Sequence, residues 1–192
     1  MQTDILTTAK SIAREAGKLA LTLFGGEREL TQKGFRDFVT DADYAVQNLI
    51  VARVCEQFPE HGFLAEEDDA TLSDAADIVW IIDPVDGTTN YSRNIPFFCV
   101  SIGVAQAGKP IVGVIYDPVR DELFWATKGG GAFLNGEPIT VSKIDTLAGA
   151  IIGHDWSRPR EMRDLILKVL MELAHETRSI RCIGSAAIAL CW

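Results

Sequence analysis

A short segment near the middle of the chain places two carboxylates directly after an apolar run. Residues 80–90 read Trp-Ile-Ile-Asp-Pro-Val-Asp-Gly-Thr-Thr-Asn. Pro84 has a fixed φ and no N–H group, so the backbone turns sharply and the carboxylates of Asp83 and Asp86 can face one point. Hard oxygen ligands that converge in this way are typical of Mg²⁺ sites. The segment therefore has the chemistry of a divalent metal site.

The residues that follow these carboxylates can bind a phosphate. Gly87 lets a ligand approach the backbone closely, and a helix that starts at Gly87 to Thr89 would present free N–H groups and a favourable dipole to an anion. A plain structural interpretation exists as well, because Asp-Pro and Asp-Gly are common turn pairs and threonine caps helices. Taken alone, this segment leaves the two interpretations equally open.

Two further acidic clusters shift that balance toward a metal site. Asp37, Asp41 and Asp43 surround the start of an expected helix, and the run Glu-Glu-Asp-Asp at 66–69 follows the apolar residues 63–65. Acids at a helix start also complement the helix dipole, and a charged run can simply be a solvated surface. The presence of three acidic clusters in one chain nevertheless favours the interpretation that they contribute to one metal site.

Competing motifs fail on their spacing. A calcium-binding EF-hand loop that begins at Asp83 requires glutamate at its twelfth position, where Asn94 stands. The glycines at 129–131 lead into an expected hairpin, whereas a dinucleotide-binding loop leads into a helix. The Asp-Ala-Asp at 41–43 could be the phospho-aspartate site of another phosphatase class, but the residues before it are too polar for a buried strand. No glycine-lysine pair has the Ser or Thr of a phosphate-binding P-loop.

The elements that must position these residues follow from the apolar spacing. Helical spacing predicts amphipathic helices at 4–24, 41–58 and 160–176. Runs rich in Val, Ile and aromatic residues predict strands at 78–82, 97–105, 111–116 and 122–126, with a possible strand at 150–153. The run at 78–82 is apolar throughout, which predicts a strand that is buried on both faces and ends at Asp83. Helices, a meander, then another strand and helix predict an α+β protein built in layers.

The whole chain has the composition of a globular protein without nucleic-acid or membrane partners. Its 192 residues carry a formal charge of −9, which repels a phosphate backbone, so we expect no nucleic acid as principal partner. No segment reaches the roughly 18 apolar residues that a membrane span requires, and the first residues lack a signal-peptide pattern. The four cysteines show no CxxC spacing, which favours reduced thiols and a cytoplasmic location.

The three acidic clusters, in this order, resemble the inositol monophosphatase family. The matching segments are Asp-Phe-Val-Thr-Asp-Ala-Asp at 37–43, Phe-Leu-Ala-Glu-Glu at 63–67 and the whole of 80–90, and Gly-Ser-Ala-Ala at 184–187 is similar to a later substrate-binding turn. The resemblance implies an α+β fold, the αβαβα layered sandwich of the inositol monophosphatase and fructose-1,6-bisphosphatase type. It also implies an N-terminal α+β part at about 1–145 and an incomplete C-terminal α/β part at about 146–192.

The metal ligands follow from the same resemblance. Glu66, Asp83 and the backbone carbonyl of Val85 would hold a first Mg²⁺ ion. Asp83 would bridge to a second ion that Asp86 shares, and Glu66 would also contact a third, weaker ion. The implied cofactor is therefore Mg²⁺, with two or three ions.

The resemblance also implies how a phosphate monoester is bound and hydrolysed. Thr88, oriented by Asp43, would align the attacking water, and Glu66 would act beside them in catalysis. Direct attack by water means that Asp41 forms no phospho-enzyme. The implied phosphate- and substrate-binding residues are Asp86, Gly87, Thr88, Gly184, Ser185 and Ala186.

Inositol monophosphate is the substrate that the resemblance favours, and the expected assembly is a homodimer. Fructose 1,6-bisphosphate, histidinol phosphate and 3′-phosphoadenosine 5′-phosphate remain alternatives, as does a non-catalytic regulatory role. One feature departs from the family pattern, because a further metal-binding aspartate is expected beyond the Gly-Ser-Ala turn and the sequence given ends at Trp192. We therefore expect the last strands of the second sheet to be missing, the second metal to be held weakly, and the activity of this chain to be low.

Overall fold

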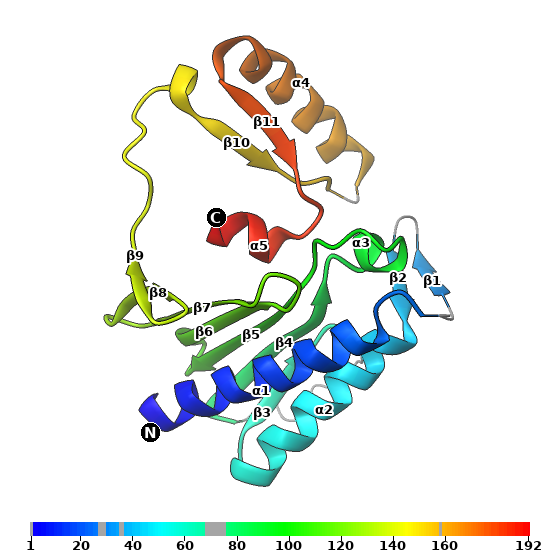
Figure 1. Cartoon of the computed structure of the whole chain (residues 1–192), viewed down its shortest axis with the longest axis vertical. Helices are drawn as coiled ribbons and strands as arrows, with labels where there is room; N and C mark the ends of the chain where they lie inside the picture. Colours follow the sequence, from blue (N-terminus) through cyan, green and yellow to red (C-terminus); the bar gives the residue numbers. More distant parts are fainter. Residues whose placement is uncertain (1, 27–29, 35–36, 68–75, 158) are drawn as a thin grey trace.

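A computed structural model of the chain describes residues 2–26, 30–34, 37–67, 76–157 and 159–192, and among these it describes the side chains outside 30–39. The elements lie in layers that alternate between helix and sheet (Figure 1). Two long helices form the first layer and a large sheet the second, followed by a short helix, a small sheet and a last helix. The predicted αβαβα order is confirmed.

Among the described residues, the large sheet has seven strands in the order in which they occur along the chain. The first two strands are parallel and every later pair is antiparallel, so the predicted meander is confirmed and is extended by a hairpin at its end. The strands are β3 (Gly62–Ala65), β4 (Ile78–Asp86), β5 (Cys99–Gln106), β6 (Lys109–Asp117), β7 (Glu122–Thr127), β8 (Gly131–Leu134) and β9 (Glu137–Ile139).

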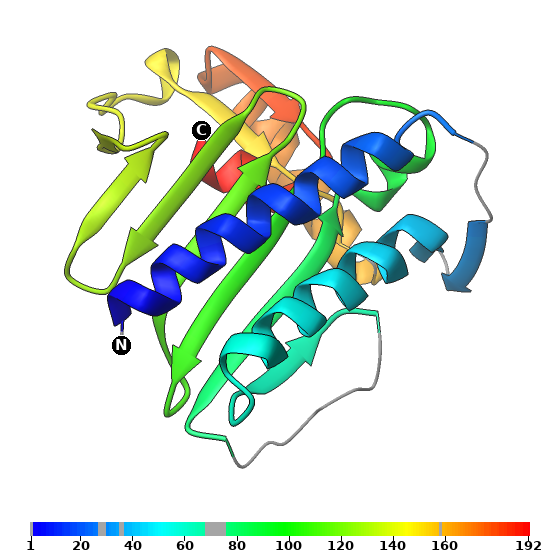
Figure 2. The ribbon, with the colours of Figure 1, turned by 60° about the horizontal axis from the view of Figure 1, so that its bottom comes forward.

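Helices α1 (Gln2–Leu23) and α2 (Asp41–Gln57) cover one face of this sheet, as Figure 2 shows. Their apolar stripes pack against sheet residues such as Trp80 to form the hydrophobic core. Small residues let α1 lie close to the strands, and a Cβ added to Gly17 would lie 2.4 Å from the ring of Tyr116. The two helices predicted from helical periodicity are therefore confirmed.

The prediction for the strand at 78–82 was wrong in two respects. Strand β4 continues to Asp86, with an irregular register against β5 between Asp83 and Asp86. It is also buried mainly on one face, because Trp80 is 0% exposed while Ile81 is 43% exposed. Successive side chains of a strand point to opposite faces, and only one face meets the helices here. An unbroken apolar run cannot show which face is covered.

The smaller sheet pairs β10 (Ile151–His154) with β11 (Ser179–Cys182) in parallel. Helix α4 (Arg160–Glu176) connects them, as a parallel pair requires. Among the described residues the other elements are α3 (Thr88–Ser92), α5 (Ala186–Cys191), the 3₁₀ helix Leu147–Gly149 and the antiparallel pair β1 (Leu30–Gly34) and β2 (Asp37–Thr40). In the described part of the chain, no helix has the length and apolar character to cross a membrane.

Candidate active site

The irregular end of β4 carries the first two carboxylates of the site. Asp83 lies opposite Ser101 of β5, and its Oδ1 accepts a hydrogen bond of 3.1 Å from the backbone N–H of Val85. The register against β5 is irregular between Asp83 and Asp86, so that Asp86 lies opposite Cys99. The sharp turn predicted at Pro84 is wrong in this respect, because β4 continues through the proline to Asp86.

Glu66 reaches the same place from the parallel neighbour strand. Directly after β3, the backbone N–H of Glu66 donates to the carbonyl oxygen of Ile82 at 3.1 Å. The next residue is fixed from the helix layer, because the N–H of Glu67 donates to Oε1 of the buried Gln47 at 3.1 Å. The loop that carries Glu66 is therefore held between β4 and α2.

The carboxyl groups of Glu66 and Asp83 lie close enough to influence each other's ionisation. Burial, together with the negative charges of Glu66 and Asp86 and a hydrogen bond to Glu66, raises the pKa of Asp83 to about 9. In the absence of positive charge, Asp83 therefore holds a proton at neutral pH. The pair lies at one end of a groove of about 750 Å³ that crosses the open face of the sheet to Lys128.

The donor chemistry of this pair fits a hard divalent cation. Both side chains offer carboxylate oxygens, and a cation would offset the neighbouring negative charges that help to raise the pKa of Asp83. Within the described residues, however, no three His, Cys, Asp or Glu side chains are grouped so that they could hold a metal ion. The carboxylate of Asp86 contacts a different element of the fold.

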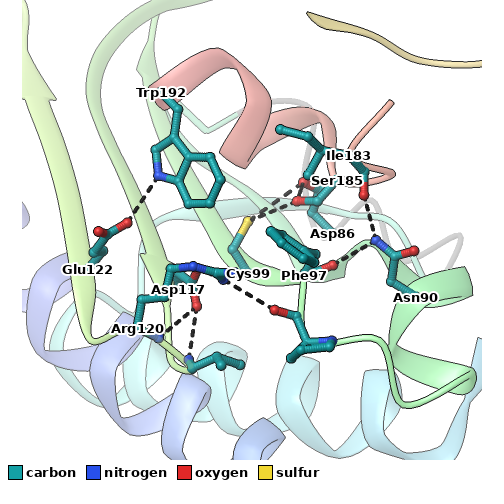
Figure 3. A network of polar contacts seen from close by, with 12 residues as sticks. Asp86, Asn90, Phe97, Cys99, Asp117, Arg120, Glu122, Ile183, Ser185 and Trp192 are labelled. Atoms are coloured by element: carbon teal, nitrogen blue, oxygen red, sulfur yellow. Dashed lines mark hydrogen bonds and ion pairs between the residues drawn. The ribbon is translucent and has the colours of Figure 1, made fainter. Parts of the chain in front are cut away.

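That element is the start of α5, which contacts both oxygens of Asp86, and Figure 3 shows the contacts of Asp86 with Ser185 and Cys99. Oδ2 accepts hydrogen bonds from the Ser185 hydroxyl at 2.5 Å and the Ala187 N–H at 2.8 Å, and Oδ1 accepts from the Ala186 N–H at 3.2 Å. The Cys99 thiol is a weaker donor to Oδ2, at 3.6 Å. Each carboxylate oxygen has two lone pairs, so Oδ1 keeps the capacity to bind a cation.

Asp43 and Thr88 meet at the junction of α2 and α3. The Thr88 Oγ1 lies 3.4 Å from Oδ1 of Asp43 and 3.1 Å from the carbonyl oxygen of Val85. Asp43 is 1% exposed, and its Oδ2 accepts hydrogen bonds from the N–H and hydroxyl of Thr40, which caps α2. Burial is the main cause that raises the pKa of Asp43. The pair that the resemblance implied is thus brought into contact.

Gly87 forms the turn from β4 into α3, and no other residue fits there. Its φ is +102°, and an added Cβ would lie 2.9 Å from the carbonyl oxygen of Phe97 and 3.2 Å from that of Gly184. The helix predicted after Gly87 is confirmed as α3, which begins at Thr88. The N–H groups of a first helical turn have no partner inside the helix, so this turn can face an anion.

The structure brings several of the predicted site residues into contact, Thr88 with Asp43 and Asp86 with the turn at 184–186. The turn at 184–186 lies against Asp86 although 99 residues separate Asp86 from Ser185, and Glu66 and Asp43 both influence Asp83. The sequence-based reasoning assigned no role to Gln47, Cys99 or Asn90. For Cys99 only a buried apolar role was expected, and its contact with Asp86 follows from strand register, which the sequence does not specify.

Comparison with known proteins gives a consistent result. The model of the Inositol monophosphatase family matches residues 1–192. Inositol monophosphatase 1 of Solanum lycopersicum is 38% identical over 194 residues, which cover 98% of this chain and 71% of that protein. The crystal structure of the extragenic suppressor protein suhB from Bartonella henselae superimposes with a TM-score of 0.93 at 33% identity, over 97% of this chain and 73% of that one.

A further similar structure was solved with ligands. It is described as an IMPase/NADP phosphatase complexed with NADP and Ca²⁺, and it matches with a TM-score of 0.83 at 25% identity, over 98% of this chain and 70% of that chain. In that protein, a phosphate-bearing ligand and a divalent cation were present together.

Proposed function

Because the chain belongs to the inositol monophosphatase family and is a phosphoric monoester hydrolase, we propose that it hydrolyses the monophosphate of a polyol or sugar, with inositol monophosphate as leading substrate. The observation that carries this proposal is the convergence of Glu66, Asp83, Asp43 and Thr88 beside a glycine turn at the start of a helix. This arrangement provides acidic ligands, a hydroxyl next to a buried carboxylate, and backbone donors for an anion.

The proposed cofactor is Mg²⁺. Glu66, Asp83 and the Val85 carbonyl would hold a first ion, and Asp83 and Asp86 a second. Ca²⁺ in the similar phosphatase structure supports a divalent cation of this oxygen-binding type. When bound, the ions supply positive charge for the phosphate oxygens and lower the pKa of water.

We assign the handling of the proton to Thr88 and Asp43. The Thr88 hydroxyl can accept a hydrogen bond from water while its own hydrogen points to Oδ1 of Asp43, 3.4 Å away. Asp43 suits the role of proton acceptor because burial raises its pKa while the Thr40 contacts hold its other oxygen in place. The backbone N–H groups of Gly87 and Thr88 would orient the phosphate, and the turn at 184–186 would contact its alcohol.

The proposed setting is a cytoplasmic homodimer that acts on a small phosphate ester. The four cysteines are free thiols, which agrees with a reducing compartment. Fructose 1,6-bisphosphate, histidinol phosphate and 3′-phosphoadenosine 5′-phosphate are the alternative substrates, and comparison of kcat/KM across all four compounds would rank them.

The metal assignment is tested by Mg²⁺ titration calorimetry and by turnover of inositol 1-phosphate. We expect low turnover that requires Mg²⁺, and we expect the Asp83→Asn variant to lose both Mg²⁺ binding and this activity because Asp83 would serve both ions. The matched control is Asp41→Asn, which removes an exposed carboxylate at the start of α2. Full activity after chelation, or in Asp83→Asn, would refute the metal assignment, and loss of activity in Asp41→Asn would favour a phospho-aspartate mechanism.

A further inference from the structure

Asn90 joins three segments of the site through one buried amide. The side chain is 9% exposed, and it extends from α3 between the residues before β5 and the end of β11. Its Nδ2 donates to the carbonyl oxygen of Phe97 at 2.9 Å and to that of Ile183 at 2.8 Å (Figure 3). The two hydrogens of the amide group are therefore both used, each for a different segment.

The turn after Ile183 packs directly against this amide. A Cβ added to Gly184, whose φ is +77°, would lie 2.9 Å from Nδ2 and 3.1 Å from Oδ1 of Asn90. On the other side, a Cβ added to Gly87 would lie 3.2 Å from the Gly184 carbonyl oxygen. Nothing larger than glycine fits at either position, so the turn lies in van der Waals contact with the start of α3.

The contacts of Asp86 and Asn90 connect both ends of the proposed phosphate-binding turn to residues 183–185. Asp86 and Asn90 flank the start of α3, and each of them contacts the same distant turn, Asn90 through Ile183 and Asp86 through Ser185. Ile183 is 93 residues from Asn90, and Ser185 is 99 residues from Asp86. Side chains at both ends of the β4–α3 segment therefore hold the turn in addition to its neighbours in sequence.

The other partner of Asn90 is anchored independently. The guanidinium group of Arg120 donates to the Pro96 carbonyl oxygen at 3.2 Å and to the buried Asp117 at 2.8 Å. It also stacks on the ring of Phe97, at 4.3 Å from the ring centroid. Without the Asn90 amide, the segment at Phe97 would keep its contacts with Arg120, and the turn at 183–185 would be held on this face only by the contacts of residues 185–187 with Asp86.

We propose that Asn90 is a positioning residue, whose amide sets the separation between the phosphate-binding N–H groups at Gly87 and Thr88 and the alcohol-binding turn at 184–186. This proposal rests on the proposed function. It predicts an effect on substrate selectivity. An ester with hydroxyls beside the phosphate would contact both the N–H groups at Gly87 and Thr88 and the turn at 184–186. A phosphate ester without such hydroxyls would contact only the N–H groups at Gly87 and Thr88.

The test compares inositol 1-phosphate with p-nitrophenyl phosphate in Asn90→Asp and Asn90→Ala. The aspartate variant keeps the size of the side chain and removes the Nδ2 donor. The alanine variant removes the donor and also shortens the side chain. We expect kcat/KM for inositol 1-phosphate to fall roughly 10–100-fold relative to that for p-nitrophenyl phosphate, since small displacements of positioning groups cost about this much. The KM for inositol 1-phosphate should account for most of the change.

The matched control is Asn135→Gly. Asn135 also bridges two backbone groups, accepting from the Leu123 N–H at 3.0 Å and donating to the Asp121 carbonyl oxygen at 2.9 Å, but it lies between β8 and β9 at the far end of the sheet. Its φ is +50°, so glycine removes the side chain without backbone strain. This variant should be less stable and should keep the wild-type ratio of the two substrates.

Hydrogen exchange of the amides at 186–187 provides a readout that does not need activity. Exchange there should be faster in Asn90→Asp than in wild type, and unchanged in Asn135→Gly. Equal loss of both activities in the Asn90 variants, or unchanged exchange at 186–187, would overturn the positioning role. A wild-type protein that hydrolyses neither ester would instead overturn the proposed function, while the exchange measurement would still decide the role of Asn90.

Discussion

At the residue scale, the candidate site contains carboxylates whose pKa values and orientations depend on the residues around them. Asp43 illustrates this, because it caps α2 with one oxygen and lies beside Thr88 with the other. The residue types and their order in the sequence indicated candidate carboxylates, and the structure places Asp43 beside Thr88 and Glu66 beside Asp83. The partners of these carboxylates could not be predicted, since the contacts of Gln47 and Cys99 with the site depend on packing and register.

Removal of either member of the Thr88–Asp43 pair should slow catalysis. We expect Thr88→Ala and Asp43→Asn each to lower kcat by roughly 10²–10⁴-fold, the range for a positioned proton acceptor. If the two act as a unit, the double variant should be little slower than either single variant. Steady-state kinetics would show this, with Thr89→Ala, an exposed neighbour, as the control. Losses that multiply in the double variant would separate the two roles.

A second residue-scale prediction concerns His61 and pH. Its Nδ1 accepts a hydrogen bond of 2.9 Å from the indole N–H of Trp80, its ring stacks on Phe58 at 4.7 Å, and burial lowers its pKa. A lowered pKa means that folding favours the neutral ring. The resulting stability is present above the unfolded pKa of about 6.5 and is lost as the pH falls through the lower folded value.

The measurement is thermal unfolding between pH 8 and pH 5 for the wild type and for His61→Gln. Glutamine keeps an acceptor for Trp80 but does not titrate, so its melting temperature should fall less over this interval. Other groups also destabilise the protein in acid, and the comparison of the two proteins removes their contribution. Identical pH profiles would show that His61 does not titrate with folding.

At the scale of elements, the long amphipathic helices were the most predictable part and the short elements the least. Helix α4 begins and ends at the predicted residues 160 and 176, because several turns of apolar spacing define it. Strands β3 and β11 and helix α5 have four to six residues each, too few for a period to be recognised. The turn at 184–186 was found by its resemblance to a family motif, while the helix that follows it was not predicted.

The glycine between β4 and α3 gives a prediction at this scale. Gly87→Ala should destabilise the protein by more than the roughly 1–2 kcal/mol that a left-handed backbone costs a residue with a Cβ, because the added atom also meets the Phe97 carbonyl oxygen at 2.9 Å. Gly108→Ala is the matched control, since its φ is +71° and no atom lies within 4 Å of an added Cβ. Urea unfolding should show the larger loss for Gly87→Ala, and equal losses would mean that the close contact relaxes without cost.

At the scale of the whole molecule, the layered order followed from the succession of elements, but the contacts between layers did not. The acidic composition predicted a protein without nucleic acid as principal partner, and the absence of CxxC spacing predicted reduced thiols. The sequence could not show that the turn after β11 reaches Asp86, because that contact depends on how the small sheet lies over the large one (Figure 1). Long-range contacts of this kind join the two sheets at the candidate site.

The last prediction concerns Mg²⁺ and the stability of the folded chain. A ligand that binds only the folded state stabilises it by about 2.7 kcal/mol at one hundred times its dissociation constant, so the melting temperature should rise with Mg²⁺ concentration. The formal charge of −9 complicates the measurement, because any salt screens the repulsion between surface carboxylates. NaCl at matched ionic strength therefore serves as the reference. The rise beyond that reference should disappear in Asp83→Asn and persist in Asp41→Asn, since burial of like charges occurs at Asp83 and Asp41 is exposed. An equal rise in both variants would show that Mg²⁺ acts by screening and not by binding at the end of β4.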